Sequence, residues 1–205
     1  ALVVIAQVEA FRAIGQRSIG LVYALVGTDT LLATIIPSNS ARAGGVIFPI
    51  ARSLAQAYDS HPGPTARRPG AYLMVAVYHC DVIACAMFLT GQASNVLIAR
   101  FAKEVSGVEL TFTSWAVAMI VPGLTALALV PIILFRLFPP EITHTPDAAS
   151  FAGRALEKMG APSRGEWMML LVFVVVALLW MTTRWHGINY TVVALMGVCF
   201  LIISG

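Results

Sequence analysis

Long apolar blocks separated by short polar stretches run along this chain. The clearest blocks cover residues 71–89, 112–138, 167–183 and 190–203. A helix needs about 20 predominantly apolar residues to cross the hydrocarbon core of a bilayer, which is about 30 Å thick. The pattern therefore predicts an all-α polytopic membrane protein in which these blocks are transmembrane helices.

The composition agrees with this pattern. Of the 205 residues, 59% are hydrophobic and 11% are charged, whereas soluble domains are about 25% charged. A net charge of +3 would suggest a nucleic-acid partner for a soluble protein, but the basic residues here lie mostly between the apolar blocks. We therefore expect the lipid bilayer as a partner, and no nucleic acid.

Both ends of the chain lie inside apolar blocks. The chain opens with ALVVIAQ, without Met, and closes with FLIISG. We therefore expect a partial chain, in which residues 1–17 are the end of a preceding helix.

The stretch TIIPSNSARAGG, residues 34–45, breaks the next apolar block. The residue before a proline is disfavoured in the α conformation, so we expect one helix over residues 18–36 and a second over residues 41–58. Each half is too short or too polar to span a bilayer comfortably. Residues 18–58 are therefore predicted to form a re-entrant helical hairpin, which requires that its tip is buried in protein or lines a water-filled cavity.

A second polar stretch, TGQASN at residues 90–95, breaks the block that begins at residue 71. A helix is expected to resume over residues 96–105. The connection that precedes this broken helix, residues 59–70, holds three prolines and two glycines and is predicted to be a loop.

The connection over residues 139–166 contains an amphipathic stretch, ASFAGRALEKMG. Its apolar side chains share one helical face: Phe151, Ala155, Leu156 and Met159. We therefore expect a cytoplasmic loop that contains a short helix.

The basic residues test the topology. If both ends of the hairpin and the 59–70 loop face the cytoplasm, the 139–166 loop does so too. The basic residues on the cytoplasmic side are then Arg12, Arg17, Arg52, Arg67, Arg68, Arg136, Arg154, Lys158 and Arg164. Those on the outer side are Arg100, Lys103 and Arg184. The excess of basic residues on the cytoplasmic side agrees with the positive-inside rule only if residues 18–58 return to the side from which they start.

The two breaks offer groups that can bind ions. A broken helix leaves N–H groups free where it resumes and carbonyls free where it stops. With the helix dipole, the N–H groups favour an anion, whereas the carbonyls favour a small cation. Secondary transporters build substrate sites in this way, so the breaks predict an anion held by neutral donors, with a cation beside it.

Particular side chains support this hypothesis. Ser38, Asn39 and Ser40 supply neutral hydrogen-bonding groups at the first break. At the second, Gly91 permits a close backbone approach, and Ser94 and Asn95 are expected to cap the resuming helix. The competing interpretation is that all of these residues serve only as helix caps.

Arg42 lies just after the first break, within the predicted hairpin. An arginine at the centre of a bilayer costs about 2.5–3.5 kcal/mol on insertion scales unless it is paired or hydrated. Its positive charge could bind a second carboxylate of a substrate or replace a sodium ion. The alternative is a structural ion pair, for which Asp29 is one candidate partner.

Three motifs in order resemble the divalent anion/sodium symporter family: PSNSARAGG followed by Phe48-Pro49, LTGQASN, and FPPEI at residues 138–142. Within that family, the chain is most similar to the 2-oxoglutarate/malate and citrate/succinate translocators of bacteria and plastids. The resemblance covers nearly the whole chain. It implies transport of di- or tricarboxylates by an elevator-type motion in the bacterial inner membrane, and a homodimer for the full-length protein.

The resemblance also implies the site residues and the domains. Substrate would bind at Asn39, Ser40, Arg42, Ser94 and Asn95, and sodium, if it is used, at Thr34, Ser38, Asn39 and Gly91. No other cofactor is implied. Residues 18–58 and 71–138 would form the transport domain, and residues 167–205 two scaffold helices. Ser40 stands where the family usually has Thr, and the second Ser-Asn-Thr loop, in an inverted repeat, is not in this chain.

Other hypotheses are weaker. His79, Cys80, Asp81 and Cys85 are close in sequence, but their spacing fits no recognised zinc pattern. Asp81 either takes part in proton or cation movement or makes a polar contact between helices. We expect anion exchange, with sodium-coupled symport as the alternative. A membrane-embedded enzyme would need a triad or metal signature that the sequence lacks, and a purely structural subunit would not need two polar breaks.

Overall fold

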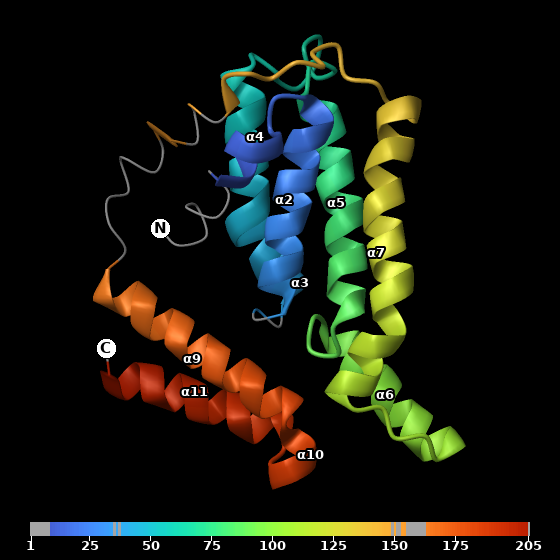
Figure 1. Ribbon diagram of the computed structural model, residues 1–205, viewed down its shortest axis with the longest axis vertical. Helices are drawn as coiled ribbons and strands as arrows, with labels where there is room; N and C mark the ends of the chain where they lie inside the picture. The colour runs from blue at the N-terminus through green and yellow to red at the C-terminus, as the bar shows by residue number, and fades with distance from the viewer. Residues whose placement is uncertain are drawn as a thin grey trace.

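The computed structural model describes residues 9–34, 36, 38–148, 150, 153–154 and 163–204. Within these ranges the chain is all-helical, as predicted, and contains no strand. Figure 1 shows the helices, which are α2 (Ser18–Ala33), α3 (Asn39–Arg42), the π-helical turn η1 (Ala43–Ile47), α4 (Phe48–Ala57), α5 (Gly70–Met87), α6 (Ala93–Ser106), α7 (Phe112–Leu137), α9 (Arg164–Met181), α10 (Thr183–His186) and α11 (Tyr190–Ser204). Of these, α5, α7 and α9 are long and apolar enough to cross a membrane.

The first break separates two antiparallel arms. Helix α2 runs toward one end of the bundle, and the chain returns through α3, η1 and α4 (Figure 1). The second arm begins at Asn39, two residues earlier than expected, because extended Ser38 caps it by accepting a hydrogen bond from the Ala41 N–H. The first arm ends at Ala33, earlier than the predicted residue 36. Part of the polar motif is therefore the first turn of a helix.

The π turn explains how the second arm stays continuous through Pro49. Proline has no N–H and clashes with the preceding helical turn. Immediately before it, the Phe48 N–H donates to the carbonyl of Ala43, five residues back. The wider turn takes up the local misfit, so the helix continues to Ala57.

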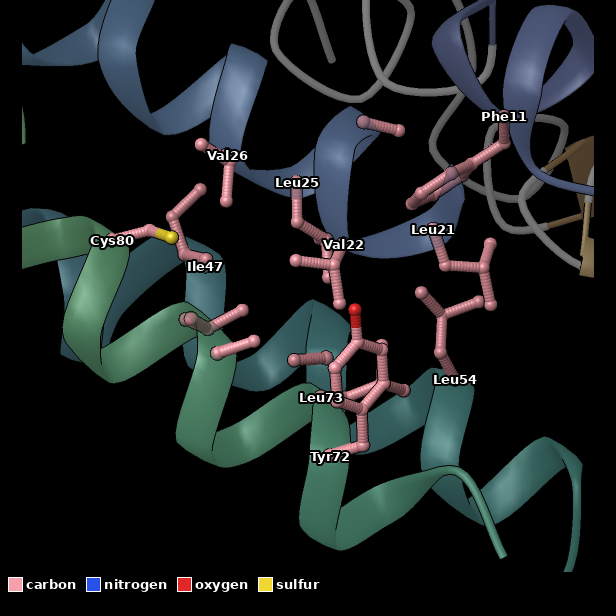
Figure 2. Packing of buried hydrophobic residues seen from close by; sticks show 14 of the residues in the cluster. Phe11, Leu21, Val22, Leu25, Val26, Ile47, Leu54, Tyr72, Leu73 and Cys80 are labelled. Atoms are coloured by element: carbon pink, nitrogen blue, oxygen red, sulfur yellow. The ribbon is translucent and has the colours of Figure 1, made fainter. Parts of the chain in front are cut away.

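The two arms pack on α5 to form the core. Leu21, Val22 and Leu25 of α2 face Ile47 and the α5 residues Tyr72 and Leu73 (Figure 2). The Tyr72 hydroxyl donates to the carbonyl of Pro131 on α7 at 3.0 Å. Burial of these large apolar side chains, at about 1.5–3 kcal/mol each, holds the arms against α5.

The connections meet at one end of the bundle. The Ser18 N–H donates to the carbonyl of Thr143, and the Glu141 N–H donates to the carbonyl of Arg67. Both ends of the hairpin, the 59–69 loop and the start of the 139–166 loop are thereby joined. Helices α6 and α10, which carry the basic residues assigned to the outside, lie at the opposite end (Figure 1). Which side of a membrane each of these ends faces stays a prediction.

Helices α9 and α11 form a separate antiparallel pair (Figure 1). The Trp180 indole donates to the carbonyl of Tyr190 across their connection. Gly197 lies against α9, where a Cβ atom would come within 2.8 Å of Val176. The amphipathic stretch predicted around Phe151, Ala155, Leu156 and Met159 lies outside the described residues.

Candidate functional site

Both breaks lie against the same end of α5. Arg42, in the first turn after the first break, bonds to Asp81 of α5. Asn95, just after the second break, bonds to the carbonyl of Cys85. Asp81 and Cys85 are about one helical turn, or about 6 Å, apart along the axis. The fold therefore brings together the two polar motifs that the sequence singled out, and Figure 1 shows both breaks at one end of the bundle.

At the first break, two of the predicted side chains serve the local backbone. The Thr34 hydroxyl donates to the carbonyl of Leu31 at 2.6 Å. The Ser38 hydroxyl accepts from the Ala41 N–H at 3.3 Å. Thr34 and Ser38 therefore end one helix and begin the next, as the capping interpretation requires. Their additional role at a cation site stays a prediction.

The next two residues, Asn39 and Ser40, do not cap a helix with their side chains. Asn39 is partly exposed and Ser40 is exposed, and within the described part of the chain neither side chain forms a hydrogen bond. Their backbone N–H groups lie ahead of the first intrahelical bond, which runs from the Arg42 N–H to the carbonyl of Ser38. Asn39 and Ser40 thus present neutral donors at the positive end of the second arm.

At the second break, Gly91 permits the close approach that the sequence suggested. A Cβ atom on Gly91 would lie 2.4 Å from the carbonyl oxygen of Cys85. The Gly91 N–H also donates to the carbonyl of Phe88 at 2.8 Å. No larger residue fits here unless the break itself moves.

Asn95 has a different local role from the predicted one. Helix α6 begins at Ala93 after Gln92, earlier than the predicted residue 96, so neither Ser94 nor Asn95 caps it. Instead the side-chain amide of Asn95 donates backward to the carbonyls of Cys85 (2.8 Å) and Phe88 (2.9 Å). These carbonyls lie in the last turn of α5 and just beyond its end, where intrahelical partners run out. Asn95 is 2% exposed and acts as a clamp on the end of the preceding helix.

Gln92 completes this clamp and was not among the residues predicted from the sequence. Its side-chain N–H group donates to the Asn95 amide oxygen at 3.0 Å. The spacing of the two residues, three apart at the start of a helix, was the signal that could have revealed the pair. Ser94, between them, is exposed and makes no side-chain hydrogen bond to the described residues, so it stays available to a ligand.

Arg42 forms a buried ion pair, which is the structural alternative that the sequence offered for this residue. Its Nε atom lies 2.5 Å from Oδ1 of Asp29, and its Nη2 atom lies 2.6 Å from Oδ1 of Asp81. The Arg42 side chain is 0% exposed. Asp81 thus makes the polar contact between helices that was one of its two expected roles. Direct contact of Arg42 with substrate stays a prediction, and in this arrangement the side chain has no exposed surface.

The neighbouring His79 does not join this cluster. It is exposed on α5, and its Nδ1 atom bonds to the carbonyl of Val75. Across the described ranges, no group of three His, Cys, Asp or Glu side chains is placed to hold a metal ion.

Comparison with known proteins gives a consistent result. Residues 5–205 match the family described as "Sodium:sulfate symporter transmembrane region". The chain is 46% identical over 191 residues to the candidate malate transporter YflS of Bacillus subtilis, covering 93% of this chain and 40% of that protein. It is 39% identical to dicarboxylate transporter 1 of spinach chloroplasts, covering 93% of this chain and 34% of the relative. It is 36% identical to the citrate/succinate antiporter of Escherichia coli K12, covering 92% and 39%.

The chain therefore spans 34–40% of the length of these relatives. The match nevertheless runs over almost all of this chain and includes both breaks and the α5 segment between them. On this basis, the chain belongs to the sodium:sulfate symporter transmembrane family, the divalent anion/sodium symporters.

Proposed function

We propose that this chain is part of a secondary transporter that exchanges di- and tricarboxylates across the inner membrane of a bacterium. The observation that carries the proposal is the pair of breaks against one end of α5, where the side chains of Asn39, Ser40 and Ser94 make no hydrogen bond to the described residues. The names of the relatives supply the substrate class, since they are malate, dicarboxylate and citrate/succinate transporters. A membrane enzyme is disfavoured because these relatives are named as transporters.

In this proposal some residues of the two breaks bind the substrate and others hold the breaks in shape. Asn39, Ser40 and Ser94 donate hydrogen bonds to substrate carboxylates, and the positive end of the second arm favours the negative charge. Ser38, Gln92 and Asn95 hold the breaks in shape through their bonds to backbone and to one another. Neutral donors suit a substrate that must also be released, because they bind an anion less strongly than a fixed positive charge does.

Exchange and sodium-coupled symport remain two candidate mechanisms. Because Asp29 and Asp81 pair with Arg42, the guanidinium alone does not take the place of a sodium ion. Exchange is supported by the Escherichia coli relative, which is named an antiporter. Symport is the second candidate, because the family description names sodium; Thr34, Ser38, Asn39 and Gly91 would then supply the sodium ligands.

The membrane arrangement is part of the same proposal. Helices α5, α7 and α9 cross the bilayer, and α2 to α4 form a re-entrant hairpin whose tip reaches the substrate. The hairpin, α5 and α7 move as a transport domain, in an elevator-type motion against a scaffold that includes α9 and α11. The complete protein forms a homodimer through that scaffold.

Counterflow in proteoliposomes tests the proposal with the complete protein. Vesicles loaded with unlabelled malate should take up labelled malate, whereas empty vesicles should not, and removing sodium should not change the rate. Uptake driven by a sodium gradient into empty vesicles would select symport. No uptake of malate, succinate, 2-oxoglutarate or citrate under either condition would reject the transport function.

A further inference from the structure

The cluster of Asp29, Arg42 and Asp81 has an unusual geometry. Adjacent guanidinium nitrogens commonly bind both oxygens of a single carboxylate. Here Nε of Arg42 bonds to Asp29 from α2, and Nη2 bonds to Asp81 from α5. Two different carboxylates therefore accept hydrogen bonds from neighbouring nitrogens of one guanidinium. This arrangement holds an oxygen of each carboxylate close to the other.

The charges of this cluster do not balance when both acids are ionised. The guanidinium keeps its proton in proteins, so the cluster then carries a net charge of −1. The three side chains are 0%, 3% and 7% exposed, and a buried unpaired charge is strongly disfavoured.

No second cation faces the cluster from the described helices packed around it. The ionisable neighbours on α2 and α5 are neutral in their usual forms: Tyr23, Tyr72, Cys80 and Cys85. The η1 turn has no ionisable side chain, and α7 has one, Arg136, in its last turn at the far end. Arg52 on α4 is exposed. Something other than these side chains must neutralise the extra negative charge.

Two buried atoms of the cluster have no hydrogen-bond partner among the described residues: Oδ2 of Asp29, which can carry a proton, and Nη1 of Arg42. When two carboxylates share one site, they characteristically hold one proton between them, because both cannot ionise at close range. We propose that Asp29 and Asp81 share one bound proton beside Arg42, so that the cluster is a neutral proton-binding site.

This site lies close to the proposed substrate groups. Arg42 is one helical turn after Ser38, to which its backbone N–H is bonded, and Asn39 and Ser40 lie between them. Loss of the proton, which leaves a carboxylate and releases H⁺ to water, would place a negative charge behind the groups that bind an anion. Dicarboxylate exchange should therefore slow as pH rises; this consequence rests on the proposed function, whereas proton binding does not.

Infrared difference spectroscopy tests proton binding directly in the purified complete protein. Raising the pH from mildly acidic to alkaline values should remove the carbonyl band of a protonated carboxylic acid in the wild type. The band should be absent in both Asp29→Asn and Asp81→Asn, because the remaining carboxylate pairs alone with Arg42 and stays ionised. Glu104→Gln, which alters an exposed pair with Arg100, should retain the band.

Two results would overturn the inference. They are the lack of a titrating band in the wild type and its survival in both asparagine variants. Loss of the band when sodium is added at constant pH would support the inference, because sodium can displace only a proton that is already bound. If a variant fails to fold, as judged by size-exclusion chromatography, the wild-type titration still decides whether a proton is bound.

Counterflow as a function of pH then separates this inference from the transport function. A dicarboxylate such as malate is ionised throughout the neutral and alkaline range, because carboxyl groups ordinarily titrate near pH 4. Above the midpoint of the site, wild-type exchange should fall by about tenfold per pH unit, as proton occupancy does. Exchange by Asp81→Asn should be independent of pH. Flat wild-type exchange overturns the coupling; a titrating band without any transport would instead reject the proposed function and leave the proton site standing.

Discussion

The guanidinium of Arg42 lies 2.6 Å from the carboxylate of Asp81, although the two residues are 39 positions apart. This bond joins the first helical turn after one break to the helix that ends at the other. With Asp29 as a second partner, Arg42 holds both arms of the hairpin and α5 in one arrangement. The position of the substrate groups in the first break thus depends on a buried polar contact beneath them.

Replacing Arg42 by methionine should strongly destabilise the protein. The change leaves two buried carboxylates without their cation, and breaking a buried pair from one side costs about 3–5 kcal/mol. Thermal unfolding of the purified protein in detergent measures the effect. Arg100→Met is the control, because its pair with Glu104 is exposed and exposed ion pairs contribute little to stability. Equal melting temperatures for the two variants would contradict the structural role of Arg42.

Replacing Asn39 by alanine should abolish most exchange without destabilising the protein. The Asn39 side chain has no bond to the described residues, so its removal takes away a substrate donor and leaves the fold intact. Counterflow at matched expression, together with thermal unfolding, measures both effects. Ser53→Ala removes an exposed hydroxyl that donates to the carbonyl of Pro49 and should transport normally. Unchanged exchange by Asn39→Ala would remove this residue from the site.

Replacing Asn95 by alanine should lower stability first and transport as a consequence. The change removes both hydrogen bonds to the carbonyls of Cys85 and Phe88, and each buried group left unsatisfied costs about 1–3 kcal/mol. Ser94→Ala, at the adjacent exposed position, should reduce exchange and leave the melting temperature unchanged. The opposite pattern for these two neighbours would show that the clamp and the substrate contact have been assigned the wrong way round.

Replacing Gly91 by alanine should distort the second break. The added Cβ atom would lie 2.4 Å from the Cys85 carbonyl oxygen, so the backbone of the break must shift, and exchange should fall. Gly27→Ala is a matched control inside α2, where a Cβ atom meets nothing within 4 Å. It should be neutral or stabilising, by up to about 1 kcal/mol from helix propensity. Similar losses of exchange in both variants would show that the close approach at Gly91 has no special role.

Much of the helical framework follows from the sequence. The apolar block at residues 112–138 becomes α7, Phe112–Leu137, nearly residue for residue. Long apolar blocks are informative because a helix satisfies its own backbone hydrogen bonds, which leaves few alternatives in a membrane. The two polar breaks were visible for the same reason, since each one interrupts such a block.

The sequence by itself thus determined where helices run, where they break and which family the breaks resemble. Only the tertiary structure decided what each polar side chain does at a break. Arg42 joins Asp29 and Asp81 from two other helices, and Asn95 turns back to α5 instead of capping α6. Helix formation depends on neighbours a few residues away, whereas the partner of a buried polar group depends on which distant helices pack beside it.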